Sequence, residues 1–278
     1  LRPIVKYAKS DEWCYDFVPH DVGKYSLANG QVYGKSEDAE KQRSNQMPIE
    51  ETGNMLVSLA AVGKYSKKIP ELFRENEELM KKWADYLDEY GYNPGMQLCT
   101  DDFAGQSSHN CNLSLKAILG IAAYSFLSGD KSYMQKAAEY AKRWEKEAKA
   151  PHGATRLSFD NPDSWSLKYN IIWDSILEFN LFSDKLKKSE VELYSKKMNR
   201  YGVPLDSRAN YTKLDWLMWS ACLVNDKTYF DKVTECITNM INETPDRVPL
   251  TDWYCSVTSS HIAFQNRSVV GGVFIAMI

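Results

Sequence analysis

The chain has 278 residues, of which 44% are hydrophobic and 13% aromatic, and this composition suits a large buried core. Its formal net charge is −3 and it has no run of basic residues, which argues against a nucleic-acid-binding surface. No stretch of about 18 consecutive apolar residues occurs, so no transmembrane helix is expected. The six cysteines show neither a CxxC nor a zinc-type Cys/His spacing, so no zinc site is expected. We expect no cofactor and assign no metal ligands, with calcium on clustered carboxylates as the open alternative.

Residues 1–45 include the polar stretch "HDVGKYSLANGQVYG" and are expected to form extended or loop structure. From residue 46 to 278 the pattern is that of helices of two alternating kinds. The first kind is apolar on nearly every face, as in "NLSLKAILGIAAYSFL", "LKYNIIWDSILEFNLF" and "KLDWLMWSACLV". The second kind is amphipathic and charged, as in "KSYMQKAAEYAKRWEKEAK" and "KTYFDKVTECITNMI". The first kind should be buried and the second should face water.

Each apolar helix is joined to its amphipathic partner by a short turn that contains an aspartate, and Asp130, Asp184 and Asp226 are predicted N-caps. The returns between pairs are long, at 91–109, 150–165, 201–211 and 243–265. This alternation predicts stacked helical hairpins with the long loops at one end. Closing them into a ring gives an all-α toroid, with an open solenoid as the competing arrangement. Binding sites are expected among the loops at the mouth of the ring.

We count four hairpins and the start of a fifth, because the final "GGVFIAMI" has the pattern of a helix that is cut short. A ring of six hairpins needs more chain. The chain therefore looks like a single toroid domain over 1–278, shortened at both ends, with 1–45 lining its mouth.

Five motifs, in order, resemble the six-hairpin domain of glutaminase A-like proteins. They are "VPHDVGKYSLANGQVYG" (18–34), "MPIEETGNM" (47–55), "NPGMQLCTDDFAG" with "HNCNLSLKAILGIAAY" (93–124), "YGVPLDSRANYTKLDW" (201–216) and "NETPDRVPLTDWY" (242–254). The resemblance implies an (α/α)6 toroid like that of many glycoside hydrolases. It also implies a glutaminase activity, a secreted, periplasmic or cell-surface location, and additional N-terminal domains in the same polypeptide. One departure is that 106–108 are Gln-Ser-Ser where the family has His-Leu-Ala.

The long loops are rich in carboxylates, and four of these are the candidate catalytic groups: Glu50, Glu51, Asp101 and Asp102. Neighbouring residues point in different directions, so each pair should offer one carboxylate to the cavity. A working pair would then come from two loops, as in hydrolysis by one acid and one base or nucleophile. The alternative is that the aspartates fix a turn and the glutamates complement a helix dipole.

Eight further residues are candidates for substrate binding: Asp21, His109, Asp206, Arg208, Trp216, Asp252, Trp253 and Arg267. His109 lies beside the carboxylate pair and could act as a base or be a hydrogen-bonded structural residue. An amino-acid substrate needs an arginine for its α-carboxylate, and Arg208, Arg247 or Arg267 could supply it unless each pairs with a neighbouring aspartate. The tryptophans could stack on sugar rings or pack the end of the ring.

The favoured interpretation is a hydrolase that acts on a small molecule or glycan, by resemblance a glutaminase that releases ammonia from glutamine. The first alternative is a glycoside hydrolase that uses two mouth carboxylates as acid and as base or nucleophile. The second is a non-catalytic toroid that binds carbohydrate or peptide.

Overall fold

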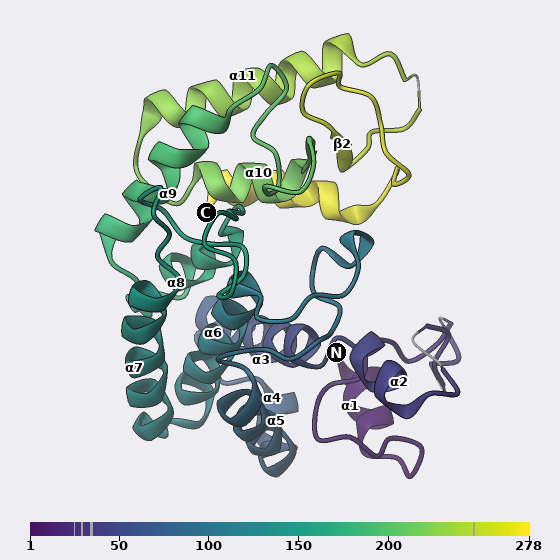
Figure 1. The fold of residues 1–278 in the computed structure, drawn as a ribbon. Helices are drawn as coiled ribbons and strands as arrows, with labels where there is room; N and C mark the ends of the chain where they lie inside the picture. The colour runs from purple at the N-terminus through teal and green to yellow at the C-terminus, as the bar shows by residue number, and fades with distance from the viewer. Residues whose placement is uncertain (25, 29, 34–35, 247) are drawn as a thin grey trace. The chain divides into compact units, whose positions relative to one another are not determined.

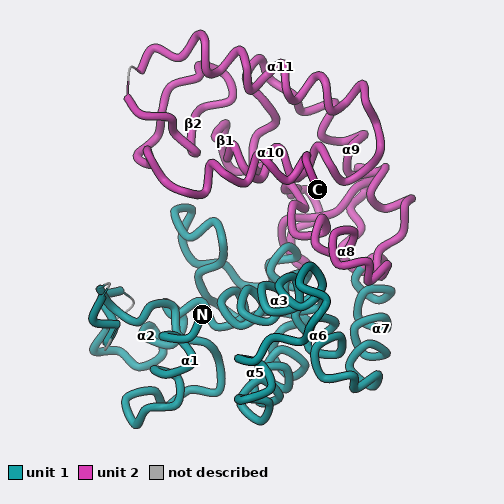
Figure 2. The backbone as a smooth tube through the Cα atoms, turned by 180° about the vertical axis from the view of Figure 1, so that it is seen from behind, with its two compact units in different colours: residues 1–144 teal, residues 145–278 magenta. Residues whose placement is uncertain are grey.

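The computed structural model describes residues 1–24, 26–28, 30–33, 36–246 and 248–278, and its regular structure is almost entirely helical (Figure 1). Arg247, one of the three candidate arginines, lies outside the described residues. The chain divides into two compact units, residues 1–144 and 145–278 (Figure 2). Each unit is treated separately below.

The first unit is built around two long helices, α3 (Pro48–Ser66) and α6 (Cys111–Ser128), which pack against each other and against α5 (Glu77–Tyr90). The other elements are α1 (Arg2–Ala8), α2 (Ala39–Asn45), α4 (Glu71–Arg74), the 3-10 turn η1 (Asp102–Ala104) and α7 (Lys131–Glu147). The segment 1–45, predicted as extended or loop structure, thus contains two short helices.

Helix α6 is buried on almost every side, as its sequence predicts. It is also long and apolar enough to cross a membrane, which differs from the sequence-based expectation, but 89% of this stretch is buried inside the protein. That degree of burial is typical of a core helix. At its start, the indole N–H of Trp144 in α7 donates to the carbonyl of Cys111 at 3.0 Å and ties the amphipathic helix to it.

Helices α3 and α6 approach each other closely at two glycines. A Cβ atom on Gly53 would lie 2.5 Å from Cγ of Lys116, and one on Gly120 would lie 3.2 Å from Cα of Gly53. Real Cβ atoms essentially never come closer than 3.0 Å to another atom, so a side chain at Gly53 would have to displace Lys116, and the 3.2 Å approach at Gly120 is tighter than most real contacts. The close contact of the two helices places the side chain of Lys116 directly against Gly53.

Gly53→Ala should therefore destabilise the protein even though alanine favours a helix. Overpacking of a tight interface costs about 1–3 kcal/mol, whereas the gain in helix propensity is about 1 kcal/mol. Urea denaturation would measure the difference. Gly63→Ala in the same helix is the control, because its Cβ would meet side chains at 3.3 Å and should change the free energy of unfolding by less than about 1 kcal/mol. Equal effects of the two substitutions would contradict the argument.

The second unit centres on α10 (Leu214–Ala221), which packs against α11 (Lys227–Glu243) and the 3-10 segment η3 (Ser268–Met277). Its other elements are η2 (Tyr169–Ile171), α8 (Ile172–Ile176), α9 (Asp184–Lys197) and the short strands β1 (Tyr211–Lys213) and β2 (Trp253–Cys255). The strands pair antiparallel with Thr212 opposite Tyr254, a feature that the sequence analysis did not predict. The apolar segment 167–182 forms a shorter helix than expected, and the last segment is a 3-10 rather than an α-helix.

The predicted aspartate caps have different outcomes. Asp226 is the N-cap of α11 and accepts the backbone N–H of Tyr229 at 3.0 Å, as predicted. Asp130 accepts the backbone N–H of Ser132 at 2.9 Å in the turn before α7. The prediction for Asp184 is wrong: Ser183 has the extended conformation of an N-cap and its Oγ accepts the backbone N–H of Leu186, while Asp184 is the first helical residue.

In chain order the described helices form the pairs α3/α5, α6/α7, α8/α9 and α10/α11, followed by η3. This is the order predicted for four hairpins and the start of a fifth, and packing within a pair is seen for α3/α5 and α10/α11. The number of hairpins stays a prediction. Closure of the hairpins into a ring stays a prediction.

Candidate functional site

Two glutamates occupy the first turn of α3. The helix begins with Pro48 after Met47, whose backbone is left-handed at φ 54°, and the side-chain oxygen of Gln97 accepts the N–H of Ile49 at 3.0 Å. Carboxylates are stabilised at this end of a helix by its dipole. The two side chains point to different surroundings, as the sequence predicts: Glu50 is 2% exposed, whereas the side chain of Glu51 is 22% exposed.

Glu51 is paired with His20, a residue that the sequence analysis did not select. His20 Nδ1 lies 2.8 Å from Glu51 Oε1, and both side chains remain partly exposed. The hydrogen bond to Glu51 raises the pKa of His20, against the opposing effect of burial. Burial raises the pKa of Glu51, and the bond to His20 opposes this shift. Water reaches both groups, and their contact favours the charged form of each: Glu51 stays ionised and His20 is more basic than usual.

Two further carboxylates act on His20, since the charges of Asp21 and Asp102 also raise its pKa. Asp21 has a structural task as well: its carboxylate accepts the backbone N–H groups of Gly23, Val32 and Tyr33 at 2.7–2.9 Å. Asp102 is exposed at the start of η1. Glu51 is thus in direct contact with His20, and the charges of two further predicted residues, Asp21 and Asp102, act on the same histidine. The adjacent His-Asp pair in the polar 18–34 motif was the available signal for it.

Glu50 belongs to a buried polar network between α3 and α6. Its Oε1 lies 3.4 Å from Lys116 Nζ and accepts the amide of Asn54 at 3.2 Å, while Lys116 donates to Asn54 Oδ1 at 2.6 Å. Lys116 is 4% exposed. Lys116 is not among the residues predicted above, although it is the one charged residue in the apolar run 111–128.

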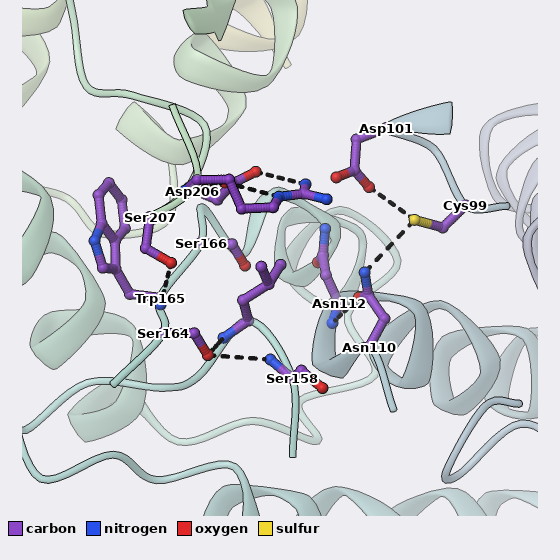
Figure 3. Close-up of polar contacts among 12 residues, drawn as sticks. Cys99, Asp101, Asn110, Asn112, Ser158, Ser164, Trp165, Ser166, Asp206 and Ser207 are labelled. Carbon is purple, nitrogen blue, oxygen red and sulfur yellow. Dashed lines mark hydrogen bonds and ion pairs between the residues drawn. The ribbon is translucent and has the colours of Figure 1, made fainter. Parts of the chain in front are cut away.

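In the loop before α6, Asp101 and His109 form hydrogen bonds with neighbouring side chains. Asp101 is buried and accepts the thiol of Cys99 at 2.8 Å, and the side chain of Asn110 lies 3.5 Å from the same sulfur (Figure 3). Burial holds the pKa of Cys99 well above its usual range, so the group is a neutral thiol rather than a nucleophile. His109 Nδ1 lies 2.8 Å from Asn93 Oδ1 and its φ is 58°, which fits the hydrogen-bonded structural alternative.

In the second unit, Asp206 and Arg208 form a bidentate ion pair. Arg208 Nε lies 3.0 Å from Asp206 Oδ1, and its Nη2 lies 2.7 Å from Oδ2. The backbone N–H of Arg208 also donates to this carboxylate. Beside the pair, Ser207 Oγ accepts the backbone N–H of Trp165 at 3.3 Å (Figure 3). Arg208 thus pairs with a neighbouring aspartate, which was the alternative to binding the α-carboxylate of a substrate.

A second charged cluster lies at the start of α10. The carboxylate of Asp252 is 0% exposed and binds both Lys213 Nζ and Arg267, whose Nη2 and Nε lie 2.5 and 3.2 Å from the two oxygens. Lys213 Nζ is 5.2 Å from the ring centroid of Trp216. The guanidinium carbon of Arg267 lies 3.9 Å from the ring centroid of Phe264. Three predicted residues, Trp216, Asp252 and Arg267, are therefore brought together, with Lys213 and Phe264 added by the structure.

The predicted tryptophans of this unit pack against other rings. Trp216 stacks on Tyr169 with centroids 4.4 Å apart and planes 10° apart. Trp253 lies 5.1 Å from Phe264 and 5.6 Å from Tyr211 between ring centroids. Both arrangements fit the packing alternative.

Asp215 adjoins this cluster and is 5% exposed. Its Oδ1 is buried and, among the described residues, has no hydrogen-bond partner. Burial raises its pKa, against the opposing charges of Lys213 and Arg267. Within the described part of the chain, no group of three or more His, Cys, Asp or Glu side chains could hold a metal ion.

Asp252→Asn should destabilise the protein by about 1.5–3 kcal/mol, the usual contribution of a hydrogen bond to a charged group. The amide keeps an oxygen acceptor but removes the counter-charge of Lys213, which is 1% exposed. Thermal or urea unfolding measures the effect. Asp231→Asn is the control, since Asp231 pairs with Lys227 on the surface and should contribute less than about 1 kcal/mol. A loss as small as that of the control would mean that Lys213 does not depend on Asp252.

Comparisons with known proteins cover the whole chain. The family described as the glutaminase A six helical-hairpin domain matches residues 1–277. Glutaminase A of Aspergillus oryzae is 31% identical over 294 residues, which cover 100% of this chain and 41% of that protein. A protein of Arthroderma benhamiae named "Probable glutaminase" is 25% identical over 368 residues, which cover 99% of this chain and 42% of that protein. The chain thus spans about two fifths of the length of these relatives, and it belongs to the glutaminase A six helical-hairpin domain family.

Proposed function

We propose that this chain is part of a glutaminase-like hydrolase that releases ammonia from glutamine and uses the His20–Glu51 pair for proton transfer. The observation that carries the proposal is this pair in a chain whose relatives are named glutaminases. We further propose that its hairpins close into a toroid, that the polypeptide has additional N-terminal domains and that it is secreted, periplasmic or at the cell surface.

The pair has the parts of an oriented general base. Glu51 engages Nδ1 of His20, and among the described residues the hydrogen bonds of this ring involve Nδ1 alone. The carboxylate fixes the tautomer that carries a proton on Nδ1, so Nε2 is left as the proton acceptor. Loss of this orientation is costly in enzymes that use a carboxylate–histidine pair.

In the proposed reaction, Nε2 of His20 takes a proton from water as the water oxygen bonds to the side-chain amide carbon of glutamine. The carbon–nitrogen bond then breaks, and the imidazolium returns its proton to the departing nitrogen, so that one water and one glutamine give glutamate and ammonium. Glu51 stabilises the imidazolium that forms between the two steps.

The deciding experiment measures ammonia released from L-glutamine by the full polypeptide, in parallel with reducing sugar released from a panel of glycans. Ammonia without sugar is the expected result. Absence of both in a folded protein would leave the binding toroid as the better interpretation.

A glycoside hydrolase is the second candidate. It is favoured by the two carboxylates Glu51 and Asp102, which come from different segments and whose charges both act on His20, because such enzymes use a pair of carboxylates. Release of sugar that is abolished in both Glu51→Gln and Asp102→Asn would establish this function and exclude the first.

A further inference from the structure

Three segments of the second unit converge on the cluster at the start of α10. The N–H of Leu214 donates to the carbonyl of Asp252 at 2.9 Å, and the N–H of Asn266 donates to the carbonyl of Leu250 at 3.0 Å. These bonds hold the residues around 213–216, 250–253 and 264–267 together. The position of the charged groups in the cluster is therefore determined by backbone contacts and not by the side chains alone.

In this cluster two cationic side chains bind a single carboxylate. Lys213 and Arg267 share one carboxylate, that of Asp252, and the Arg267 side chain remains 40% exposed. Arg267 binds Asp252 through Nη2 and Nε, and among the described residues no hydrogen bond involves its Nη1. One face of the guanidinium is covered by Phe264, so the free edge can receive a second anionic group.

Asp215 supplies the complementary feature. It follows Leu214, whose N–H donates to the carbonyl of Asp252, and precedes Trp216, whose ring centroid lies 5.2 Å from Lys213 Nζ. Its Oδ1 is buried without a partner among the described residues. A buried carboxylate oxygen without a donor is costly, and a native site generally provides one. A cationic or N–H donor group would satisfy it.

We propose that the cluster binds the α-amino and α-carboxylate groups of an amino acid, the carboxylate on Arg267 and the ammonium on Asp215. The ligand class rests on the proposed glutaminase function, whereas the site is drawn from the second unit alone. Asp215 and Arg267 are binding residues in this proposal, and Asp252 positions Arg267 between Phe264 and the ligand. A neutral sugar could use Asp215 but would leave the guanidinium without a partner.

The test is calorimetric binding to the full polypeptide of three probes: L-glutamate, glutarate, which lacks the ammonium, and 4-aminobutanamide, which lacks the α-carboxylate. L-Glutamate should bind at least about tenfold more tightly than either of the others, because a hydrogen bond to a charged group is worth about one to two factors of ten. Equal affinities, or no binding of L-glutamate, would overturn the proposal without any variant being made.

Two variants assign the site. Arg267→Gln should weaken L-glutamate and glutarate about 10- to 100-fold, whereas Asp215→Asn should weaken L-glutamate but leave glutarate unchanged. Arg267→Gln should still fold, because Asp252 keeps Lys213 as its counter-charge. The matched controls are Arg200→Gln, which breaks an exposed bidentate pair with Glu243 in the same unit, and Asp231→Asn.

Native affinity for L-glutamate in both site variants would overturn the proposal, as would binding of a neutral monosaccharide that is lost in Asp215→Asn and kept in Arg267→Gln. The result of this binding test can be told apart from the result of the ammonia-release test. Specific L-glutamate binding that depends on Asp215 and Arg267, in a protein that releases no ammonia, would support this site and contradict the glutaminase proposal.

Discussion

Glu51→Gln should reduce kcat for ammonia release by about 10²- to 10⁴-fold, the range that general acid–base groups contribute. The amide keeps the size of the side chain but carries no charge, so it cannot stabilise the imidazolium of His20 and can hold the ring in the wrong tautomer. The side chain is partly exposed, so the protein should remain folded, which circular dichroism and thermal unfolding would establish.

The same variant should move the acidic limb of the pH–rate profile. The proposed base is neutral His20, so activity rises as the pH increases through the folded-state pKa of that residue, which lies above the ordinary value of 6.5. The hydrogen bond to Glu51 is the largest cause of that increase in pKa. Removal of the charge lowers the pKa, and the residual activity should therefore reach its plateau at a lower pH than in the native protein.

Two comparisons make the result specific. Glu75→Gln, in an exposed ion pair with Arg2, should leave kcat and the pH profile unchanged. His20→Gln should lower kcat at least as far as Glu51→Gln does, and the double variant should be little worse than His20→Gln alone, since the two side chains act as a unit. Full activity of Glu51→Gln would remove the pair from the mechanism. An unshifted acidic limb would show that His20 is not the titrating base.

The sequence predicts the helical pairs well because burial imposes a simple pattern. The run 111–128 is apolar on all sides and forms the fully buried α6, and the amphipathic run that follows forms α7. The pattern predicts helix starts less well where two neighbouring residues could each be the N-cap. At α9, Ser183 and Asp184 are both favoured N-caps, and only the backbone conformation decides between them. Strands β1 and β2 have three residues each, too few for a period of two to be recognised.

For the candidate site, the sequence indicates some of the residues but not their partners. Acidic residues in long loops are visible in the sequence and indicate Glu51, Asp102 and Asp252, whereas Arg267 follows from the cation that an amino-acid substrate needs. Their partners come from distant segments: His20 lies 31 residues from Glu51, and Lys213 lies 39 residues from Asp252. No spacing rule connects such residues, so the sequence cannot tell whether Arg208 and Arg267 face a ligand or an aspartate.

Lys116→Met should destabilise the protein by about 3–5 kcal/mol, the usual cost of removing one partner of a buried ion pair. The loss arises because Glu50, 2% exposed, keeps its charge without the ammonium. Methionine fills a similar volume and packs well, so the lost charge is the main cause. Urea denaturation would measure the change, with Lys136→Met as the control, because the Lys136 side chain beside Asp88 is 45% exposed and its ion pair is screened by water.

The double variant Glu50→Gln/Lys116→Met separates the charge from the packing. If the cost of the single change is the unpaired carboxylate, removal of that carboxylate should restore most of the lost free energy of unfolding, since buried ion pairs are often replaced by neutral groups at little cost. A double variant as unstable as Lys116→Met would show instead that the lysine is needed for its bond to Asn54. If the double variant is stable but releases less ammonia, the buried pair serves the position of Glu51, one residue along the same helix, rather than the stability of the fold.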